Sequence, residues 1–518
     1  MDTGLKNDRS LGRFAINLVA NIGNFVLASL IGIWFIPYLI HSLGIAAYGL
    51  IPLATTITSY MAIITFGVNS ATGRFLTITL NQNDDEKSNI IFNNSLLGSI
   101  ALVLVLFLPS ALLVYYADDI IQVPIGFESQ AQWLLVCTII AFFINTIKTP
   151  FDISSFSRNR FDLRNLVSII ELFVRVGSVV VFFWVVGRQV WYVGLGIVLG
   201  VIASFAGSFT LWRILTPNLH IRLRSFDLSV FRSLANTSGW VVLNTIGSIL
   251  FIGIDLIVVN RLFGAEMGGR YAAILQWPNL LRGFASIISG IFAPTILYYY
   301  AEKNIDGLVY YACNAVKFLG IFIALPVGLV IGFSKPLLFI WLGKDFITLS
   351  PLLVLMVAPL CINLAILPLL SLQLAVNKVK IPGLVTLAMG ITNLILALLL
   401  AGSTRLGLYG VALAGAIVLS AKNLIFIPVY AAHVLGQSYR TFYKGIFTII
   451  SFTLLVTGTA WLISFIHPIE NWITLSAAGL FTSIFYVFII YFTALSSKEK
   501  NMLSELLHNL WNKDRPSL

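Results

Sequence analysis

Charged side chains are scarce in this sequence. Asp, Glu, Lys and Arg together make up 10% of its 518 residues, against roughly 25% in an ordinary soluble domain. Hydrophobic residues make up 58%, and the mean hydropathy is +0.94. This composition excludes an ordinary soluble protein and indicates an integral membrane protein, with almost nothing left over for a soluble domain.

Cysteine and histidine are also rare, and the signatures of several enzyme classes are missing. The three cysteines, Cys137, Cys313 and Cys361, fall in apolar stretches, which argues against a disulfide framework and a CxxC metal site. No G-x-x-x-x-G-K-[ST] loop, H-E-x-x-H helix or G-x-S-x-G elbow occurs. The five histidines lie near the ends of apolar runs or in loops. We therefore expect no P-loop ATPase, no metal, no cofactor and no enzymatic activity.

Apolar runs of about 20 residues fill the chain, each long enough to cross about 30 Å of hydrocarbon as a helix. Helices are expected because these runs lack the alternation and the short length of barrel strands. The sequence predicts an all-α polytopic membrane protein with about 14 transmembrane helices. We place them at 14–39, 47–67, 90–115, 131–151, 165–187, 190–212, 239–262, 271–298, 308–333, 349–370, 380–402, 408–432, 443–467 and 472–495.

Most Lys and Arg residues fall on one side of this topology. They gather in segments 148–165, 212–232 and 377–380 and in the tail 496–518, whereas segment 117–129 on the other side has none. Because basic loops stay in the cytoplasm, both termini are predicted to be cytoplasmic. The net charge of +11 then reflects topology and contact with anionic lipids, and it does not indicate a nucleic-acid partner. In the tail, apolar residues at helical spacing predict an interfacial amphipathic helix, with a solvated helix as the alternative.

Similar residues recur in the two halves of the chain. Asn21, Gly23, Tyr48 and Gly67 are matched by Asn244, Gly247, Tyr271 and Gly290. The spacing from the first Gly to Tyr differs by one position between the copies, and the spacing from Tyr to the last Gly is the same. Parallel repeats of this kind predict two six-helix lobes. The expected divisions are an N-terminal lobe (1–213), a cytoplasmic linker (214–238), a C-terminal lobe (239–432), two further helices (433–495) and the tail (496–518).

Two stretches carry a family resemblance. Residues 27–75 form a hairpin with "LG" and "YG" at its turn, "FG" at its close and Arg74 downstream, and residues 254–273 read "IDLIVVNRLFGAEMGGRYAA". They resemble the polysaccharide transporter branch of the multidrug/oligosaccharidyl-lipid/polysaccharide exporter superfamily, the O-antigen flippases. The resemblance implies two lobes around a central cavity and alternating access. It also implies carriage of undecaprenyl-pyrophosphate-linked sugar repeats across the bacterial inner membrane, and it allows a polysaccharide polymerase as a partner.

Basic residues inside the spans fit an anionic cargo. A pyrophosphate with polar sugars needs a wet, cationic cavity and an opening for its lipid tail. Arg282 and Lys422 lie nearest mid-span, where a cation costs about 2.5–3.5 kcal/mol unless it faces protein or water. We predict that both line the cavity and bind the pyrophosphate. Lys317 is a further candidate that could instead snorkel to the headgroups.

The remaining polar candidates each have a structural alternative. Arg175 either joins the cavity or forms an i,i+4 ion pair with Glu171. Arg74 is a candidate near the cytoplasmic entrance. The amides of Asn21, Asn24 and Asn244 either line the cavity or hydrogen-bond a neighbouring helix, and the second reading is the default. The two repeat tyrosines are expected to shape exterior turns and to anchor at the membrane interface.

One carboxylate, Asp255, interrupts the apolar run "FIGIDLIVVN" about two turns from the exterior end of its helix. Without compensation an acid there favours its protonated form. Three interpretations remain open: a salt bridge to Arg282, a site that binds H⁺ or Na⁺ to drive transport, and a polar helix contact. The coupling interpretation leads, because an exporter without ATPase motifs needs another energy source.

Other functions are also open. A multidrug antiporter of the same superfamily would need buried carboxylates and few buried cations, the opposite of the charges found mid-span. As its family is known, a lipid-II flippase carries charges on its first helix, and residues 14–39 contain none. A polytopic polysaccharide polymerase would need a sizeable exterior loop, whereas 116–130 and 334–348 are short.

Overall fold

Helices make up the regular structure in the part of the chain that the computed structural model describes, which is residues 2–222, 227, 245–251, 253–494 and 500. The predicted all-α fold is confirmed. The principal helices are α1 (Asp2–Leu43), α2 (Ile45–Asn81), α3 (Asp85–Tyr115), α4 (Ala117–Ile120), α5 (Glu128–Ser157), α6 (Phe161–Val185), α7 (Trp191–Leu215), α9 (Ile254–Ala301), α10 (Ile305–Gly332), α11 (Ser334–Leu342), η2 (Lys344–Leu349), α12 (Ser350–Val357), α13 (Leu360–Ala365), α14 (Leu367–Ala375), α15 (Lys380–Ser403), α16 (Leu408–Ala421), η3 (Lys422–Phe426), α17 (Ile427–Val434), α18 (Tyr443–Ile466) and α19 (Trp472–Thr493).

Thirteen helical runs among the described residues are long and apolar enough to cross a membrane. One of them, Thr245–Ala301, has 57 residues. At 1.5 Å per residue it would be about 85 Å long, far more than one bilayer crossing. Its backbone leaves helical geometry at Gly264, where φ is 90° and ψ is 171°. The run is therefore two helices joined by a tight turn, which agrees with the predicted total of about fourteen spans.

Gly44 makes the same kind of turn between α1 and α2. Its φ of 83° lies in the region that a residue with a Cβ rarely adopts, so glycine relieves a strain that other residues would bear. The "LG" of the first hairpin and the "FG" at Gly264 thus reverse the chain in corresponding places of the two halves.

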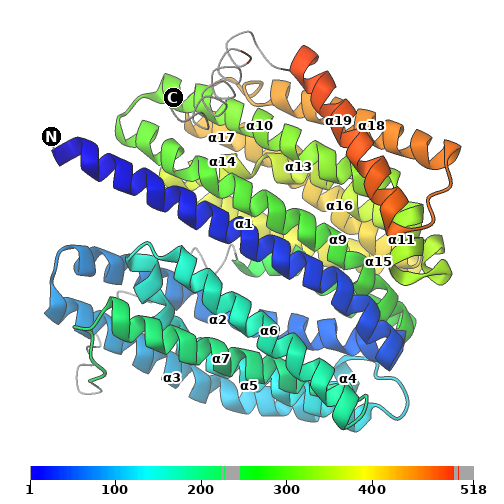
Figure 1. Ribbon diagram of the computed structural model, residues 1–518, viewed down its shortest axis with the longest axis horizontal. Helices are drawn as coiled ribbons and strands as arrows, with labels where there is room; N and C mark the ends of the chain where they lie inside the picture. The colour runs from blue at the N-terminus through cyan, green and yellow to red at the C-terminus, as the bar shows by residue number, and fades with distance from the viewer. Residues whose placement is uncertain (1, 223–226, 228–244, 252, 495–499, 501–518) are drawn as a thin grey trace, which may run out of the picture.

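The helices form two groups, which Figure 1 shows one above the other. In the lower group α5 packs on α7 and α2, and α6 packs on α7. In the upper group α9 and α10 contact α12, α13 and α14, while α18 and α19 lie along α10. The helix α1 runs between the groups, with contacts to α6 and α2 on one side and to α9 and α11 on the other. The N-terminus lies at one end of the bundle, and α4 and α11 lie at the opposite end.

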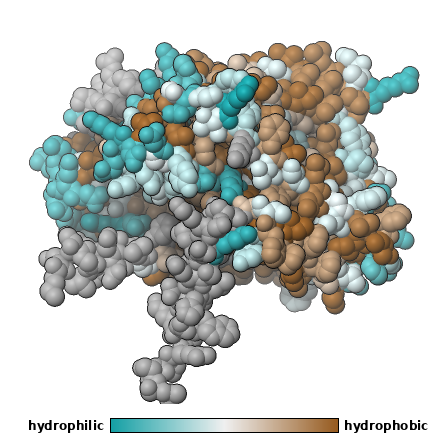
Figure 2. Space-filling view, turned by 90° about the horizontal axis from the view of Figure 1, so that it is seen from above, coloured by the Kyte–Doolittle hydropathy of each residue, from teal (hydrophilic) through white to brown (hydrophobic). Residues whose placement is uncertain are grey.

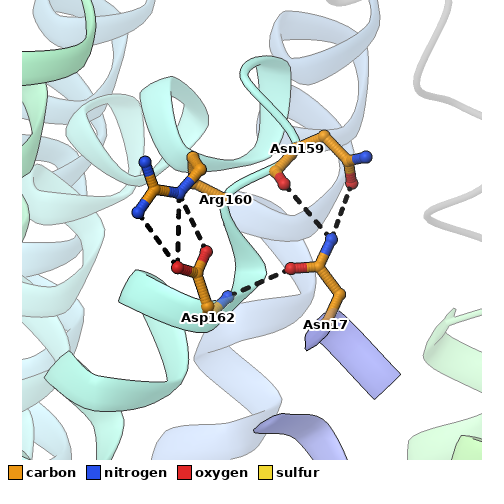
Figure 3. Close-up of polar contacts among 4 residues, drawn as sticks. All are labelled: Asn17, Asn159, Arg160 and Asp162. Carbon is orange, nitrogen blue, oxygen red and sulfur yellow. Dashed lines mark hydrogen bonds and ion pairs between the residues drawn. The ribbon is translucent and has the colours of Figure 1, made fainter. Parts of the chain in front are cut away.

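Asparagines on α1 fasten it to the lower group. The Asn17 amide donates to the backbone oxygen of Asn159 at 3.2 Å and to its side-chain oxygen at 3.1 Å, and its own oxygen accepts from the backbone N–H of Asp162 at 3.3 Å (Figure 3). Arg160 forms an ion pair with Asp162 at 3.0 Å beside this contact. One turn on, Asn165 of α6 donates to Asn21 at 2.7 Å. These bonds satisfy polar groups that lipid could not, and they fix α1 against α6.

The loop predicted over 148–165 is much shorter in the structure. The helix α5 continues to Ser157 and α6 starts at Phe161, so only a three-residue turn separates them. Asn159 closes this turn in the left-handed region at φ 53°, a conformation that Asn tolerates better than most residues. Lys148 therefore lies inside a helix, where it is buried.

A ladder of side-chain amides on α3 holds the start of the chain that follows α7. Asn89 and Asn93, one helical turn apart, donate to the carbonyl oxygens of Asn218 and His220 at 2.9 Å each. In return they accept from the backbone N–H groups of His220 at 2.7 Å and Arg222 at 2.6 Å. The first part of the predicted linker 214–238 is thereby docked on the lower group, and most of its remainder lies outside the described residues.

The two groups touch at the end opposite the N-terminus through a close helix crossing. A Cβ placed on Gly49 of α2 would lie 2.8 Å from the backbone of Gly269 in α9, and one on Gly269 would overlap the carbonyl oxygen of Ile45. Only residues without a Cβ let the backbones approach this closely. Beside the crossing, the backbone N–H of Gln122 donates to Asn260 at 2.8 Å, and the Asn260 amide donates back to the Gln122 carbonyl at 3.1 Å.

The surface fits a lipid environment. Large apolar side chains stand out from many helices, such as Trp184 at 88% exposure, Phe465 at 77% and Ile473 at 81%. Figure 2 shows apolar residues over most of one side of the molecule and hydrophilic residues gathered toward one end. Exposed apolar area on this scale is stable only in contact with hydrocarbon. The chain is a multi-pass membrane protein.

Candidate functional site

A small polar cavity of about 40 Å³ lies inside the upper group of helices. Asp255, Tyr271 and Arg282 reach it from α9, and Asn363 reaches it from α13. Apolar side chains of α9, α12 and α16 complete the wall. A cavity with room for one water molecule needs roughly 10–15 Å³, so this one admits a few waters or a small cation.

Asp255 is the buried acid of this cavity. Its exposure is 8%, and its Oδ1 accepts a hydrogen bond from the Asn393 amide of α15 at 3.2 Å. A Cβ on Gly415 would contact Asp255 Oδ2 at 3.4 Å and Asn393 Oδ1 at 3.7 Å. The glycine in α16 therefore leaves the space beside the carboxylate open.

Arg282 lines the same cavity but does not form an ion pair with Asp255 in the described structure. Its guanidinium donates to Asn279 at 3.1 Å, one turn earlier on the helix. Arg282 and Asp255 interact electrostatically, yet no salt bridge of 4.0 Å or less joins them in the described structure. The Tyr271 hydroxyl also interacts with the carboxylate. Of the three interpretations of Asp255, the salt bridge to Arg282 is therefore absent within 4.0 Å in the described structure, which leaves both side chains available to a third partner.

Two buried polar atoms beside the cavity have no hydrogen-bond partner among the described residues. They are Asn393 Oδ1 and Asn363 Nδ2, on residues with 0% and 4% exposure. A buried polar atom left unpaired costs about 1–3 kcal/mol. Water in the cavity would satisfy both atoms, whereas a cation would satisfy only the acceptor Asn393 Oδ1. A carboxylate with an amide oxygen is a donor set that suits a hard cation.

Lys422 does not line the cavity itself, but it lies beside Phe251, which does. It opens η3, a π-helical turn, and its ammonium sits 5.6 Å from the centre of the Phe251 ring, which lines the cavity. Its neighbour Asn423 donates to Asn363 at 3.1 Å. Such π-turns occur often at functional sites because they re-aim side chains out of the regular helical register. The structure thus brings three predicted residues, Asp255, Arg282 and Lys422, to one region of the upper group.

The other predicted cations lie elsewhere. Lys317 of α10 packs beside the Phe318 ring at 5.4 Å and lies near Gly445 of α18. Arg74 is exposed on α2 and stands two turns before the end of that helix. Arg175 of α6 interacts electrostatically with Glu171 but forms no ion pair with it within 4.0 Å in the described structure.

Glu171 belongs instead to a charged cluster that the sequence did not reveal. Lys148 donates to Ser204 at 2.7 Å and lies 3.7 Å from Asp152 and 3.9 Å from Glu171. Asp152 also accepts from the Ser208 hydroxyl. These residues join α5, α6 and α7. The cluster holds one cation and two carboxylates, and Arg175 interacts electrostatically with the second carboxylate, Glu171.

The amides predicted as alternative cavity residues follow the default interpretation where the structure describes them. Asn21 accepts from Asn165, and Asn24 donates to Asn165 at 3.1 Å, so both hydrogen-bond the neighbouring helix. Asn244 lies outside the described residues. The repeat tyrosines do not anchor at an interface: Tyr48 is 4% and Tyr271 is 1% exposed. That prediction is wrong because both side chains pack in the core next to the glycines of the helix crossing.

Comparison with known proteins gives the chain a family. The polysaccharide biosynthesis protein family matches residues 15–300, more than half of its length. The chain belongs to this family. A relative from Bacillus subtilis (strain 168), the uncharacterized membrane protein EpsK, is 32% identical over 491 residues, which is 95% of this chain and 97% of EpsK. The family resemblance seen in residues 27–75 and 254–273 is confirmed.

Solved transporters share the fold of this polysaccharide biosynthesis family member. An inward-facing multidrug resistance MATE family transporter of the MOP superfamily aligns with a TM-score of 0.59 at 14% identity, over 85% of this chain and 98% of that one. The lipid II flippase MurJ in an inward closed conformation aligns with a TM-score of 0.57 at 16% identity, over 90% and 98%. At these identities the likeness establishes the architecture alone.

Several residues of the site escaped the sequence reading. Asn363 and Asn393 stand in the apolar runs "LCINLAIL" and "MGITNLIL", where an isolated amide is itself a signal of a buried polar contact. Tyr271 was assigned to a turn because the exterior end of its helix was placed at the tyrosine itself. Gly415 carries no signal in the sequence, since its role depends on which side chain faces it from another helix.

Proposed function

We propose that the protein is a flippase that moves undecaprenyl-pyrophosphate-linked oligosaccharides across the bacterial inner membrane for assembly of a surface polysaccharide such as O-antigen, capsule or exopolysaccharide. The observation that carries the proposal is the meeting of Asp255, Arg282 and Lys422 at one buried region in a member of the polysaccharide biosynthesis family. The fold is that of transporters, and the proposal includes no enzymatic step.

Arg282 and Lys422 are the proposed pyrophosphate ligands. Neither cation has an ion-pair partner within 4.0 Å in the described structure, and both lie deep in a membrane span, where an unpaired cation is unfavourable. A pyrophosphate would supply the missing anion and accept charge-assisted hydrogen bonds from both, in a conformation of the transport cycle whose cavity is wider than the 40 Å³ described here. The Arg282 guanidinium offers a planar pair of donors, while Lys422 offers a point charge at the end of a flexible stem.

Asp255 is the proposed coupling site for H⁺ or Na⁺. The open space beside Gly415, the unpaired oxygen of Asn393 and the carboxylate together favour a small cation or a proton carried with water. Arg282 interacts electrostatically with Asp255. A cation bound to the Asp255 carboxylate therefore weakens the attraction between Asp255 and Arg282, and the Arg282 guanidinium becomes more available to the pyrophosphate. This linkage gives the ion gradient a route to the transport cycle.

Alternating access is the proposed mechanism, with the two lobes moving about the region of α1. The crossing at Gly49 and Gly269 and the contact of Gln122 with Asn260 hold the lobes together at the end opposite the N-terminus. With both termini cytoplasmic, as the basic loops indicate, this end is exterior, so the described conformation is closed on the outside. A cysteine at Ser157 should then resist impermeant thiol reagents added to intact cells, whereas one at Lys344 should react.

A test of the cargo site uses surface polysaccharide as its readout. Arg282→Ala and Lys422→Ala should each abolish it while the protein still inserts in the membrane, and Arg282→Lys should rescue only part because the bidentate fork is lost. Arg405→Ala, which removes an exposed cation elsewhere on the upper group, is the matched control. Normal polysaccharide in cells that carry the double alanine variant would contradict the proposal.

A cation antiporter is the second candidate, and Asp255 in a MATE-like fold is the observation that favours it. The two functions separate on substrate. An antiporter would confer resistance to organic cations that depends on Asp255, and it would need neither Arg282 nor Lys422. Proposed partners of the flippase are the anionic lipids around its basic face and a polysaccharide polymerase that receives its product.

A further inference from the structure

A second cavity, much larger than the first, lies at the end of the upper group opposite the N-terminus. It measures about 780 Å³ and is bounded by α10, α11, α12, α16 and α18. None of the residues proposed to bind cargo or ion lines it. Its shape and chemistry therefore need an explanation of their own.

The walls of this cleft change from polar to apolar with depth. Where α11 and α12 begin, it is lined by the buried Ser334 and Ser350 and by the exposed side chain of Lys335, and Ser464 lines it from the last turn of α18. Deeper along the cleft follow Val354, Leu355 and Ala358, with Thr457 of α18 as a polar exception. From Ser350 to Ala358 the helix rises about 12 Å. A polar rim above an apolar wall of this length matches a phospholipid lying along α12 with its headgroup at the membrane surface.

Lys335 gives the rim its charge. The side chain is exposed, and no carboxylate lies within 4.0 Å of its ammonium in the described part of the chain. The hydroxyl groups below it already pair with each other, since Ser350 donates to Ser334 at 2.8 Å. The free positive charge therefore selects an anionic group from the membrane, and a lipid phosphate is the anion present at that depth.

The cleft opens sideways into the bilayer. Trp461 and Phe465 of α18 line it while remaining 59% and 77% exposed, so they border lipid on one side and the cleft on the other. A space of 780 Å³ between spanning helices does not stay empty in a membrane. Its deeper wall offers water the single hydroxyl of Thr457, fewer partners than an ordered water needs. An acyl chain fills such a wall without leaving polar groups unpaired.

We propose that this cleft is a binding site for one anionic phospholipid, with the phosphate at Lys335 and an acyl chain against Val354 and Ala358. The proposal is independent of the cargo and of ion coupling. It uses the proposed orientation only to assign the lipid to the outer leaflet. Leu355 lines both this cleft and the small polar cavity, so the bound lipid also supports one wall of the ion site.

Binding can be measured directly on the full-length protein. After delipidation in detergent, palmitoyl-oleoyl phosphatidylglycerol is titrated and the bound lipids are counted by native mass spectrometry. One unpaired lysine near a membrane surface contributes about fivefold in affinity for an anionic lipid. Lys335→Ala should weaken the tightest site by that factor. Lys344→Ala, which removes another exposed lysine of the same region outside the cleft, should leave it unchanged.

A second measurement reports on the apolar depth. Lipid with brominated acyl chains should quench part of the tryptophan fluorescence, and that part should disappear in Trp461→Phe. Ala358→Phe, which fills the cleft and keeps Lys335, should remove both the quenching and the tight site. Equal binding of the two lysine variants, or equal affinity for phosphatidylglycerol and phosphatidylcholine, overturns the proposal. Displacement of the phosphatidylglycerol by a polyprenyl pyrophosphate would assign the cleft to the cargo and would also overturn it.

Discussion

Substitution of Gly269 by alanine should open the end of the protein that the structure shows closed. The backbones of α2 and α9 cross so closely that the new Cβ would overlap the Ile45 carbonyl oxygen. Either the helices separate or the closed state carries strain, and overpacking of this kind costs about 1–3 kcal/mol. Because the strain applies only while the crossing is formed, it shifts the population from closed to open by about five- to 150-fold.

Gly290→Ala is the matched control for this prediction. It makes the same change in the same helix, at a position where a Cβ would meet no atom within 4 Å. Spin labels at Asp119 and Lys344, one exposed site on each lobe near the crossing, report the separation by pulsed electron resonance. The three native cysteines, all free, are first replaced by serine. Gly269→Ala should add a longer distance that Gly290→Ala lacks. Identical distance distributions for the two variants would refute the argument that the glycine contact closes this end.

Three further outcomes follow from the packing. Gly415→Val should reduce ion affinity at least tenfold in a binding assay with folding retained, because its side chain enters the space beside Asp255; unchanged affinity would remove the cavity from the ion site. Lys148→Ala should lower the free energy of unfolding by about 1–3 kcal/mol, because two partly buried carboxylates lose their partner. The control Lys87→Ala breaks an exposed ion pair and should change the free energy of unfolding by less than about 1 kcal/mol. Asn93 is a fully buried amide that hydrogen-bonds the backbone of His220 and Arg222. Asn93→Ala should lower the free energy of unfolding by about 1–3 kcal/mol and expose the chain after α7 to proteolysis. Protease resistance equal to that of the wild type would contradict the docking of this segment on α3.

The transmembrane helices could be predicted because they depend on local composition. Each described span is a long apolar run. The longest of these runs is divided at Gly264, between the predicted spans 239–262 and 271–298. The ends of spans are harder to predict, since charged residues can continue a helix when a neighbour satisfies them. Segment 148–165 was assigned to a cytoplasmic loop for this reason, although the predicted span 131–151 already included Lys148. Its partners Ser204 and Glu171 lie on two other helices, and nothing local to Lys148 identifies them.

The candidate site could be predicted in part. Asp255, Arg282 and Lys422 are conspicuous because a charge in an apolar run needs an explanation wherever the helix lies. What the sequence does not contain is their mutual arrangement. Asn393 meets Asp255 across 138 positions of chain, and Arg282 stays outside ion-pair distance although it stands on the adjoining helix. Both facts depend on how helices rotate and tilt against one another, which small residues such as Gly415 decide.

Ion-coupled flipping by the purified protein is the most direct test of the central claim, which is that Asp255 links an ion gradient to movement of a lipid-linked oligosaccharide. The protein is reconstituted in liposomes with a fluorescent undecaprenyl-pyrophosphate oligosaccharide, and the fraction reaching the far leaflet is followed with and without an imposed H⁺ or Na⁺ gradient. Wild-type protein should flip the lipid faster with one of the gradients. Asp255→Asn should bind the lipid as well as wild type, turn over slowly and lose the dependence on the gradient. Wild-type rates with unchanged gradient dependence in Asp255→Asn would contradict the account and leave Asp255 as a polar contact between helices.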